Sequence, residues 1–164
     1  MGRGETRDDR NNAHNFEGRV VIIQDSREQK PLDFKGIEGV EKVEVMGLSF
    51  GDYSGIVCGK PAPIIFERKG MGDLFGTMTS GYERFKREME RARESNMTLI
   101  ILVEGTYSDV WQGIEHSQFD GPSMVKKLAT LMVKYDLHTW FCESRRVMAR
   151  RIVDTFSAIE RNYA

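Results

Sequence analysis

The sequence predicts a mixed α/β fold in which a central sheet of about six strands is flanked by helices. Short apolar segments separated by glycines are grouped between residues 19 and 69, and helical segments alternate with strands after residue 70. This order of elements is typical of a mixed sheet with helices on both faces. Segment 97–105 contains the unbroken apolar run LIILV, which is typical of a strand covered on both faces.

Length and composition are those of a single globular domain. The chain has 164 residues, of which 40% are hydrophobic and 30% are charged, and its formal net charge is -1. There is no overall basic excess of the kind that indicates nucleic-acid binding, but a balanced total can hide a basic face. The apolar runs are too short to cross a bilayer and no signal segment begins the chain. We therefore expect no membrane contact and an intracellular location, in the cytoplasm, the nucleoid or the nucleus.

The cysteines and histidines form no recognisable metal or disulfide pattern. Cys58 and Cys142 are far apart, and the three histidines are scattered along the chain. We expect two thiols in a reducing compartment rather than a disulfide framework or a zinc site.

Four strands are predicted in the first half of the chain. Residues 1–18 are polar and lack apolar periodicity, so we expect a flexible tail before one domain over residues 19–164. Runs rich in β-branched residues, separated by glycines, predict strands at residues 19–25, 40–48, 51–59 and 62–69.

Helical patterns begin after residue 70. A short helix is expected over residues 73–79. Ser80 and Glu83 have the spacing of a capping box, which predicts the start of a second helix ending near Asn96. The inner face of this second helix would carry Tyr82, Phe85, Met89 and Ala92.

The last third of the chain predicts two more helices around a short strand. For residues 106–118 the pattern is compatible with either a loop or a short helix, with Trp111 and Ile114 as the anchors in both cases. Pro122 suits the first turn of a helix that runs to Tyr135, and residues 138–142 form the last strand. The apolar side of that helix would be Val125, Leu128, Ala129 and Met132. Ser144 would cap a closing helix whose inner face is Met148, Ile152, Phe156 and Ile159.

Carboxylates stand at the ends of three predicted strands, as Asp25, Asp52 and Glu67. Residues i and i+2 of a strand share a face, so Glu67 and Lys69 should point the same way and Arg68 the opposite way. A glycine-containing turn between Asp52 and Glu67 is compatible with adjacent antiparallel strands. Asp52, Glu67 and Lys69 would then meet at one rim of the sheet.

This combination of side chains fits phosphodiester hydrolysis. Carboxylate oxygens bind a hard divalent ion such as Mg²⁺, which lowers the pKa of an attacking water and neutralises developing charge. A neighbouring lysine can orient that water or stabilise the same charge. The alternative is that strand ends are charged because they reach solvent, and for any single acid this alternative is favoured.

Five sequence blocks carry a more specific signal. They are VIIQDSREQKPL, LSFGDYSG, IIFERKGMGDL, SGYERFKREM and LIILVEG. Together they resemble the nuclease domain of the xeroderma pigmentosum group F family, whose signature is GD, a variable stretch, ERK, three residues and D. The resemblance covers about residues 20–156 and implies a metal-dependent DNA endonuclease with a restriction-endonuclease-like core.

The resemblance implies roles for the residues that match the signature. Asp25, Asp52 and Glu67 would be ligands of Mg²⁺, for which Mn²⁺ could substitute, and would be catalytic together with Lys69. All four are present in this chain, which favours an active enzyme over the alternative of a catalytically silent DNA-binding or dimerisation subunit. A nuclease of invasive or viral DNA would share the same chemistry.

Five further residues would face phosphate or organise the site. Arg27, Arg68 and Arg84 are candidates to grip phosphate, because a guanidinium can bind it through two hydrogen bonds. Glu28 and Asp73 would brace those arginines and the helix beside the site. Arg84 departs from the family pattern, since GYERF differs from the usual glycine-arginine-aromatic arrangement.

The resemblance also implies partners. The expected substrate is branched, flap, fork or double-stranded DNA, in repair or recombination. Helices 123–135 and 144–163 are candidates for a homodimer face, although packing on the sheet is the favoured explanation of their apolar sides. Family members usually continue into helix-hairpin-helix modules, which do not follow this core, so DNA-structure recognition would come from a protein partner unless the core suffices.

Overall fold

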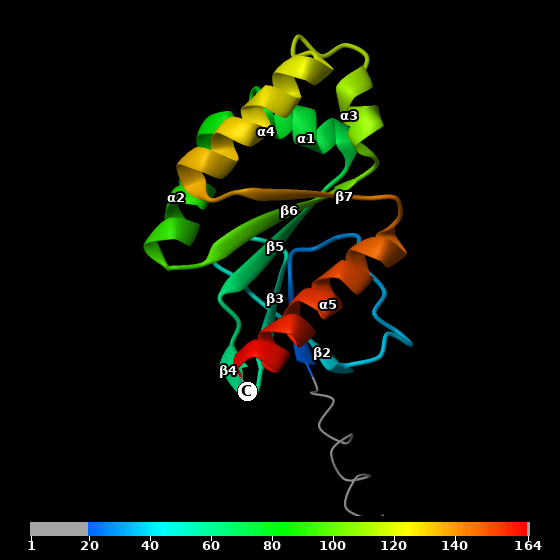
Figure 1. Ribbon diagram of the computed structural model, residues 1–164, viewed down its shortest axis with the longest axis vertical. Helices are drawn as coiled ribbons and strands as arrows, with labels where there is room; N and C mark the ends of the chain where they lie inside the picture. The colour runs from blue at the N-terminus through cyan, green and yellow to red at the C-terminus, as the bar shows by residue number, and fades with distance from the viewer. Residues whose placement is uncertain (1–19, 164) are drawn as a thin grey trace, which may run out of the picture.

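The computed structural model describes residues 20–163, and its centre is one mixed β-sheet (Figure 1). The tail predicted over residues 1–18 lies outside the described residues. The strands are β1 (Val20–Asp25), β2 (Val40–Met46), β3 (Tyr53–Val57), β4 (Lys60–Pro61), β5 (Ile64–Lys69), β6 (Thr98–Glu104) and β7 (His138–Cys142). The helices are α1 (Met71–Met78), α2 (Tyr82–Glu94), α3 (Tyr107–Gln112), α4 (Gly121–Tyr135) and α5 (Arg145–Tyr163).

Six strands lie side by side in the order β2-β1-β3-β5-β6-β7, and the two-residue strand β4 pairs with β3. Strand β3 runs antiparallel to both β1 and β5, whereas β1–β2, β5–β6 and β6–β7 are parallel pairs. The mixed sheet of about six strands that the sequence predicts is therefore confirmed.

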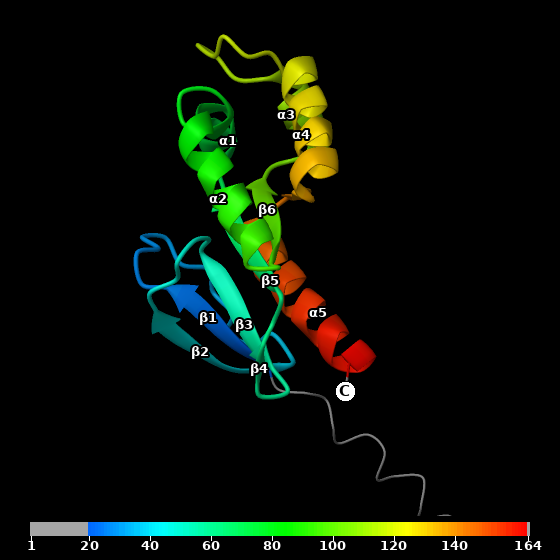
Figure 2. The ribbon, with the colours of Figure 1, turned by 90° about the vertical axis from the view of Figure 1, so that its left-hand side faces the viewer.

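Strand alternation divides the core into two layers. On one face, Phe66 and Phe156 meet edge to face, with ring centroids 5.6 Å apart, where α5 packs on the sheet. On the other face, Ile65 and Ile101 belong to the layer that contains the buried side chains of α1, α2 and α4. Figures 1 and 2 show α5 on the face opposite these helices. Both faces of β6 are covered, as its apolar sequence predicts, and Leu99–Val103 are all buried.

The closing helix follows the sequence prediction closely. The backbone N–H of Val147 donates to Ser144 Oγ at 3.1 Å, so Ser144 is the expected cap. Met148, Ile152 and Phe156 are fully buried against the sheet. No helix within residues 20–163 is long and apolar enough to span a membrane.

The capping box predicted at Ser80 and Glu83 is wrong. Helix α2 begins at Tyr82 with Gly81 at its N-cap, and no side chain caps it. Residues 79–81 form a tight turn after α1, in which the Gly81 N–H donates to Gly76 O at 2.9 Å. This turn ends α1 and starts α2 within three residues, which leaves Ser80 inside the turn.

The apolar side predicted for α4 is only partly correct. The buried residues are Met124, Leu128 and Leu131, while Ala129 is exposed and Met132 is 50% exposed. The first turn of the helix packs tightly on α3, because a Cβ at Gly121 would lie 1.9 Å from the carbonyl oxygen of Trp111. This close approach helps to set the rotation of α4, which periodicity alone did not predict.

The region left open at residues 106–118 contains helix α3. Thr106 and Asp109 form a reciprocal capping box, with the Asp109 N–H donating to Thr106 Oγ1 at 3.1 Å. The anchor of this helix is the buried Val110, whereas Trp111 is 50% exposed. The expectation that Trp111 would anchor the segment is therefore wrong, because Trp111 stacks on Tyr107 at the surface.

Candidate active site

The predicted strand-end acids lie at one rim of the sheet, where β1 and β5 end and β3 begins. The Asp25 N–H donates to the Asp52 carbonyl oxygen, and the Asp52 N–H donates to the Phe66 carbonyl oxygen, both at 2.8 Å. Gly51 permits this entry into β3, since it has φ +73° and a Cβ there would lie 2.6 Å from Ile65 Cγ1. The antiparallel pairing expected between the segments of Asp52 and Glu67 is confirmed.

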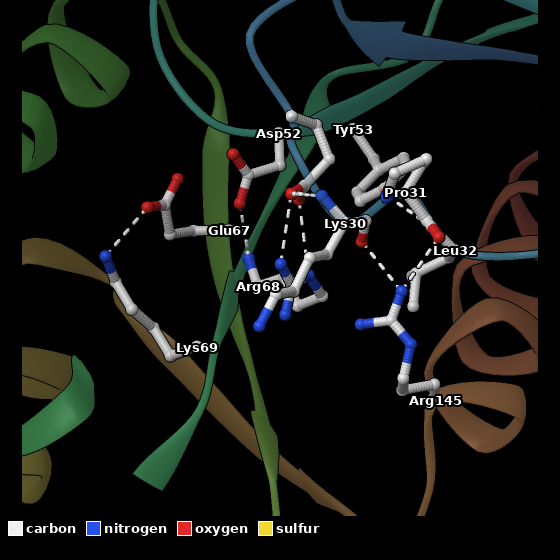
Figure 3. Close-up of polar contacts among 10 residues, drawn as sticks. Lys30, Pro31, Leu32, Asp52, Tyr53, Glu67, Arg68, Lys69 and Arg145 are labelled. Carbon is white, nitrogen blue, oxygen red and sulfur yellow. Dashed lines mark hydrogen bonds and ion pairs between the residues drawn. The ribbon is translucent and has the colours of Figure 1, made fainter. Parts of the chain in front are cut away.

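Strand β5 presents its charged residues to opposite faces, as alternation predicts. Glu67 and Lys69 share the face of α1 and α2, and Lys69 Nζ lies 2.9 Å from Glu67 Oε1 (Figure 3). Arg68 points to the other side, where its Nη2 and Nε donate to the two carboxylate oxygens of Glu28 at 3.0 and 3.2 Å. The Glu28 and Arg68 side chains are only 6% and 14% exposed. Arg68 is thus held in a buried bidentate ion pair, which orients the end of β5.

The Asp52 carboxylate is held next to that of Glu67. Its Oδ2 accepts a hydrogen bond from the Arg68 N–H at 2.8 Å, which fixes the side chain along β5 (Figure 3). Burial, and then the negative charge of Glu67, raise the pKa of Asp52 to about 7. Two carboxylates in this position repel each other, so the site favours a cation between them.

Asp25 is 4% exposed and already has several partners. Its Oδ2 accepts from Arg27 Nε at 2.9 Å, and its Oδ1 accepts from the Leu48 N–H at 2.9 Å and from Arg27 Nη2 at 3.3 Å. Burial opposes ionisation, but these hydrogen bonds lower the pKa of Asp25 below its usual value. Asp25 therefore ties the end of β1 to the chain that leads into β3, and its role as a ligand stays a prediction.

Two hollows flank the end of β5. The first, here called the helix-side hollow, has a volume of about 340 Å³ and lies between β5, α1 and α2. Its polar lining includes Glu67, Lys69, Asp73, Arg84 and Glu88. The second, the loop-side hollow, has a volume of about 790 Å³. Its lining includes Arg27, Lys30, Asp52, Arg68, Asp73 and Arg145.

Every predicted site residue except Asp25 lines one of these hollows. Asp73 lines both of them from the first turn of α1. Arg27 and Arg84 have side chains that are 69% and 84% exposed, so both guanidinium groups can reach an anion from solvent. Within residues 20–163, however, no set of three or more His, Cys, Asp or Glu side chains is arranged to hold a metal. The acids that the structure brings together most directly are Asp52 and Glu67.

The sequence did not identify Glu88 as a site residue. Its side chain is 19% exposed, and it extends from α2 into the helix-side hollow. Burial, and then the charge of Glu67, raise the pKa of Glu88. The inner face predicted for this helix contained Tyr82, Phe85, Met89 and Ala92, and Glu88 was not part of it. The feature of the sequence that could have indicated this position is that Glu88 directly precedes Met89, which lies on the apolar side of the helix.

The loop-side hollow also contains cations that the sequence did not indicate. Arg145 Nη2 donates to the carbonyl oxygens of Lys30 and Pro31 at 2.7 and 2.8 Å (Figure 3). The Leu32 N–H donates to the hydroxyl of the buried Tyr53 at 2.8 Å. These bonds fix the loop after β1 to α5 and β3, and they keep Lys30 and Arg145 near the end of β5.

Comparison with known proteins identifies the family. The family model described as the ERCC4 domain matches residues 24–154, which include the whole signature. The chain belongs to the ERCC4 domain family. This confirms the resemblance to the xeroderma pigmentosum group F nuclease domain. No curated protein sequence matches the chain.

Two solved structures share the fold of this ERCC4 domain. XPF from Aeropyrum pernix in complex with DNA is 21% identical, with a TM-score of 0.67, and the match covers 88% of this chain and 66% of that chain. XPF from Aeropyrum pernix is also 20% identical, with a TM-score of 0.65, and the match covers 87% of this chain and 66% of that chain. The ERCC4 domain described here thus spans about two thirds of those proteins.

The ion pair between Glu28 and Arg68 should contribute strongly to the stability of the ERCC4 domain. Replacing Glu28 with Gln leaves a buried guanidinium without its counter-charge, so the free energy of unfolding should fall by about 3 kcal/mol. Urea unfolding at neutral pH measures this change. Glu44→Gln is the matched control, because the Lys42–Glu44 pair is exposed and its loss should cost less than about 1 kcal/mol.

The difference between wild type and Glu28→Gln should depend on pH. Although burial opposes ionisation of Glu28, its hydrogen bonds with Arg68 lower its pKa below the ordinary 4.5. A lowered carboxylate pKa stabilises the fold above the unfolded-state value, and this stabilisation is lost as the pH falls through the folded-state value. The two proteins should therefore converge in stability below pH 4.5. A difference that stayed constant down to low pH would contradict the assignment.

Proposed function

We propose that this ERCC4 domain is a metal-dependent endonuclease that hydrolyses phosphodiester bonds in DNA, with branched, flap or fork structures as substrates. The observation that carries the proposal is the assembly of Asp52, Glu67 and Lys69 at one rim of the sheet, where Glu67 and Lys69 line the helix-side hollow and Asp52 lines the loop-side hollow. A catalytically silent subunit is less well supported, because all three side chains are retained and placed together. DNA as substrate implies an intracellular role in repair or recombination.

The donor set fits Mg²⁺, with Mn²⁺ as a substitute. Both ions prefer carboxylate oxygens. Burial and then the repulsion from Glu67 raise the pKa of Asp52, and a cation between Asp52 and Glu67 would relieve that repulsion. Asp25 is the third candidate ligand, at the adjacent end of β1. When bound, the ion would lower the pKa of a water molecule and neutralise charge on the phosphate.

The remaining residues of the site have distinct roles in this proposal. The Lys69 ammonium would stabilise charge that develops on the phosphate oxygens. The exposed guanidinium of Arg84 would hold a phosphate of the DNA backbone. Arg27 is also exposed, but its Nε and Nη2 pair with Asp25, so it would offer phosphate its remaining Nη1. Arg68 would organise the site through Glu28 rather than bind DNA, because its Nε and Nη2 already donate to the Glu28 carboxylate. Asp73 would stabilise the first turn of α1, where a negative charge is favourable.

We also propose a homodimer through α4. Its outer side exposes Met132 and Val133, whose exposed fractions are 50% and 84%. Burial of such side chains against a second copy would be favourable. Helix α5 is a weaker candidate than the sequence suggested, because its apolar side is already buried against the sheet.

Removing one carboxylate charge should abolish DNA cleavage. Asp52→Asn and Glu67→Gln keep the side-chain volume but remove a metal-binding oxygen, so the cleavage rate should fall at least about 100-fold. Cleavage of labelled duplex, flap and fork DNA with Mg²⁺ or EDTA measures this, and calorimetry should show weaker Mg²⁺ binding. Glu41→Gln, an exposed acid on β2, is the control. Wild-type cleavage by Asp52→Asn would remove Asp52 from the metal site.

Arg84 should contribute one phosphate contact to DNA binding. Arg84→Ala should weaken binding to every DNA sequence and reduce the slope of log affinity against log salt by about 1. Fluorescence anisotropy with labelled DNA and EDTA, across a range of salt concentrations, measures both quantities. Arg150→Ala on α5 is the matched control, since Arg150 pairs with Asp154 on the opposite face of the sheet. An unchanged slope for Arg84→Ala would place Arg84 outside the DNA path.

An acidic side chain on the outer side of α4 should disrupt the homodimer. Val133→Glu places a charge on the proposed contact, so the molar mass measured by light scattering after gel filtration should fall to that of a monomer. Val45→Glu is the control, because Val45 is 62% exposed on the edge strand β2, at the other end of the sheet. A wild-type protein that is monomeric at all concentrations would contradict the proposal.

A further inference from the structure

Glu88 differs from the other acids of helix α2 in its surroundings. Its side chain is 19% exposed, whereas that of Glu90, on the same helix, is 46% exposed. Phe85, Met89 and Ala92 bury the inner side of α2 against the sheet. Glu88 lies at the edge of this buried side, and it therefore extends into the helix-side hollow instead of into solvent.

The contacts of Glu88 leave its charge largely unmatched. Among residues 20–163 it makes one ion-pair contact, in which Arg84 Nε lies 3.9 Å from Glu88 Oε1, and it has no hydrogen bond. The Arg84 side chain is 84% exposed, so this contact is weak. The charges that Glu88 faces across the hollow include those of Glu67, Lys69 and Asp73, and Arg91 lies on its own helix.

Lys69 is the group in this hollow that needs a second partner. Its side chain is 17% exposed, and its ammonium pairs with Glu67 at 2.9 Å. If Glu67 binds a divalent ion, as proposed above, its negative charge is shared with that ion, and the ion repels the ammonium. A half-buried ammonium without a counter-charge is costly. Lys69 would then move into solvent unless another carboxylate holds it in the hollow.

We propose that Glu88 is this carboxylate: it is a positioning residue that takes over Lys69 from Glu67 when the metal binds, and so keeps the ammonium directed at the phosphate. This inference rests on the proposed nuclease function. It also explains why an acid occupies a half-buried position beside two other acids, where its own charge is unfavourable in the absence of metal.

Two other roles for Glu88 make different predictions. If Glu88 served only as a helix-surface partner of Arg84, its replacement would change little, because an exposed pair of this kind contributes little to stability. If Glu88 were itself a metal ligand, its replacement would weaken Mg²⁺ binding. A positioning role predicts a loss in kcat, and any loss of Mg²⁺ affinity that accompanies it should depend on Lys69.

The test compares Glu88→Gln, Glu88→Asp and the matched control Glu90→Gln in the whole chain. Glu88→Gln should lower kcat about 10- to 100-fold, the range typical of residues that orient catalytic groups. Its DNA affinity should be unchanged or higher, because a negative charge near the phosphate path is removed. Its Mg²⁺ affinity by calorimetry should fall only while Lys69 is present, because Lys69 then stays on Glu67 and competes with the ion. Glu88→Asp should retain part of the activity, and Glu90→Gln should behave like wild type.

The decisive comparison is a double-mutant cycle with Lys69→Met. If Glu88 acts through Lys69, Glu88→Gln should have no further effect on kcat once Lys69 is absent. An equal loss in both backgrounds would overturn the proposal, as would wild-type kinetics for Glu88→Gln. A fall in Mg²⁺ affinity of the same size in the Lys69→Met background would also overturn it and would assign Glu88 as a ligand.

A second measurement separates this inference from the proposed activity. In protein labelled with ¹³C-lysine, the NMR signal of Lys69 Cε is identified by its absence from Lys69→Met. Glu88→Gln should shift this signal in the Mg²⁺-loaded protein and leave it nearly unchanged without metal, where Glu67 is the partner. If the wild type cleaves no DNA, the proposed function fails, and the Lys69 signal still decides whether Glu88 takes over the ammonium. No shift in either state would overturn the pairing.

Discussion

The pairing of β3 with β5 is the constraint on which the site depends. The Asp52 N–H donates to the Phe66 carbonyl oxygen, and the Arg68 N–H donates back to the Asp52 carboxylate, each at 2.8 Å. These two bonds fix the register of the strands and the direction of the Asp52 side chain together. A slip of one residue would turn Glu67 and Lys69 to the opposite face of the sheet. The core packing and the position of the acids therefore depend on the same ladder.

Strand alternation then separates the charges by function. Glu67 and Lys69 face the helix-side hollow, where reaction chemistry is proposed, while Arg68 faces the other side and forms a buried pair with Glu28. Because neighbouring residues of β5 face opposite sides of the sheet, this six-residue strand supplies the proposed reactive groups on one side and the arginine that stabilises the rim on the other. Because the bidentate pair with Glu28 uses the Arg68 fork fully, Arg68 stabilises the rim and does not compete for phosphate.

The carboxylates of the site repel one another. Asp52, Glu67 and Glu88 lie close enough for burial and mutual repulsion to raise the pKa of Asp52 and of Glu88. Such repulsion destabilises the fold, and a cation relieves it. The surrounding structure offsets this cost with the Arg27–Asp25 and Arg68–Glu28 pairs and with two apolar layers, one on each face of the sheet.

The sequence alone determined the features that depend on local pattern and on the family signature. Strand alternation placed Glu67 and Lys69 on one face, the glycine-containing turn brought Asp52 beside them, and Ser144 began the last helix. Only the tertiary structure decided how far α4 rotates, that Gly81 begins α2, and that Asp25 is held by Arg27 and Leu48. It also placed Glu88 of α2 in the site. The physical reason is range: alternation and capping act between neighbours in the chain, whereas the rotation of a helix and the burial of its edge residues depend on partners that are distant in sequence.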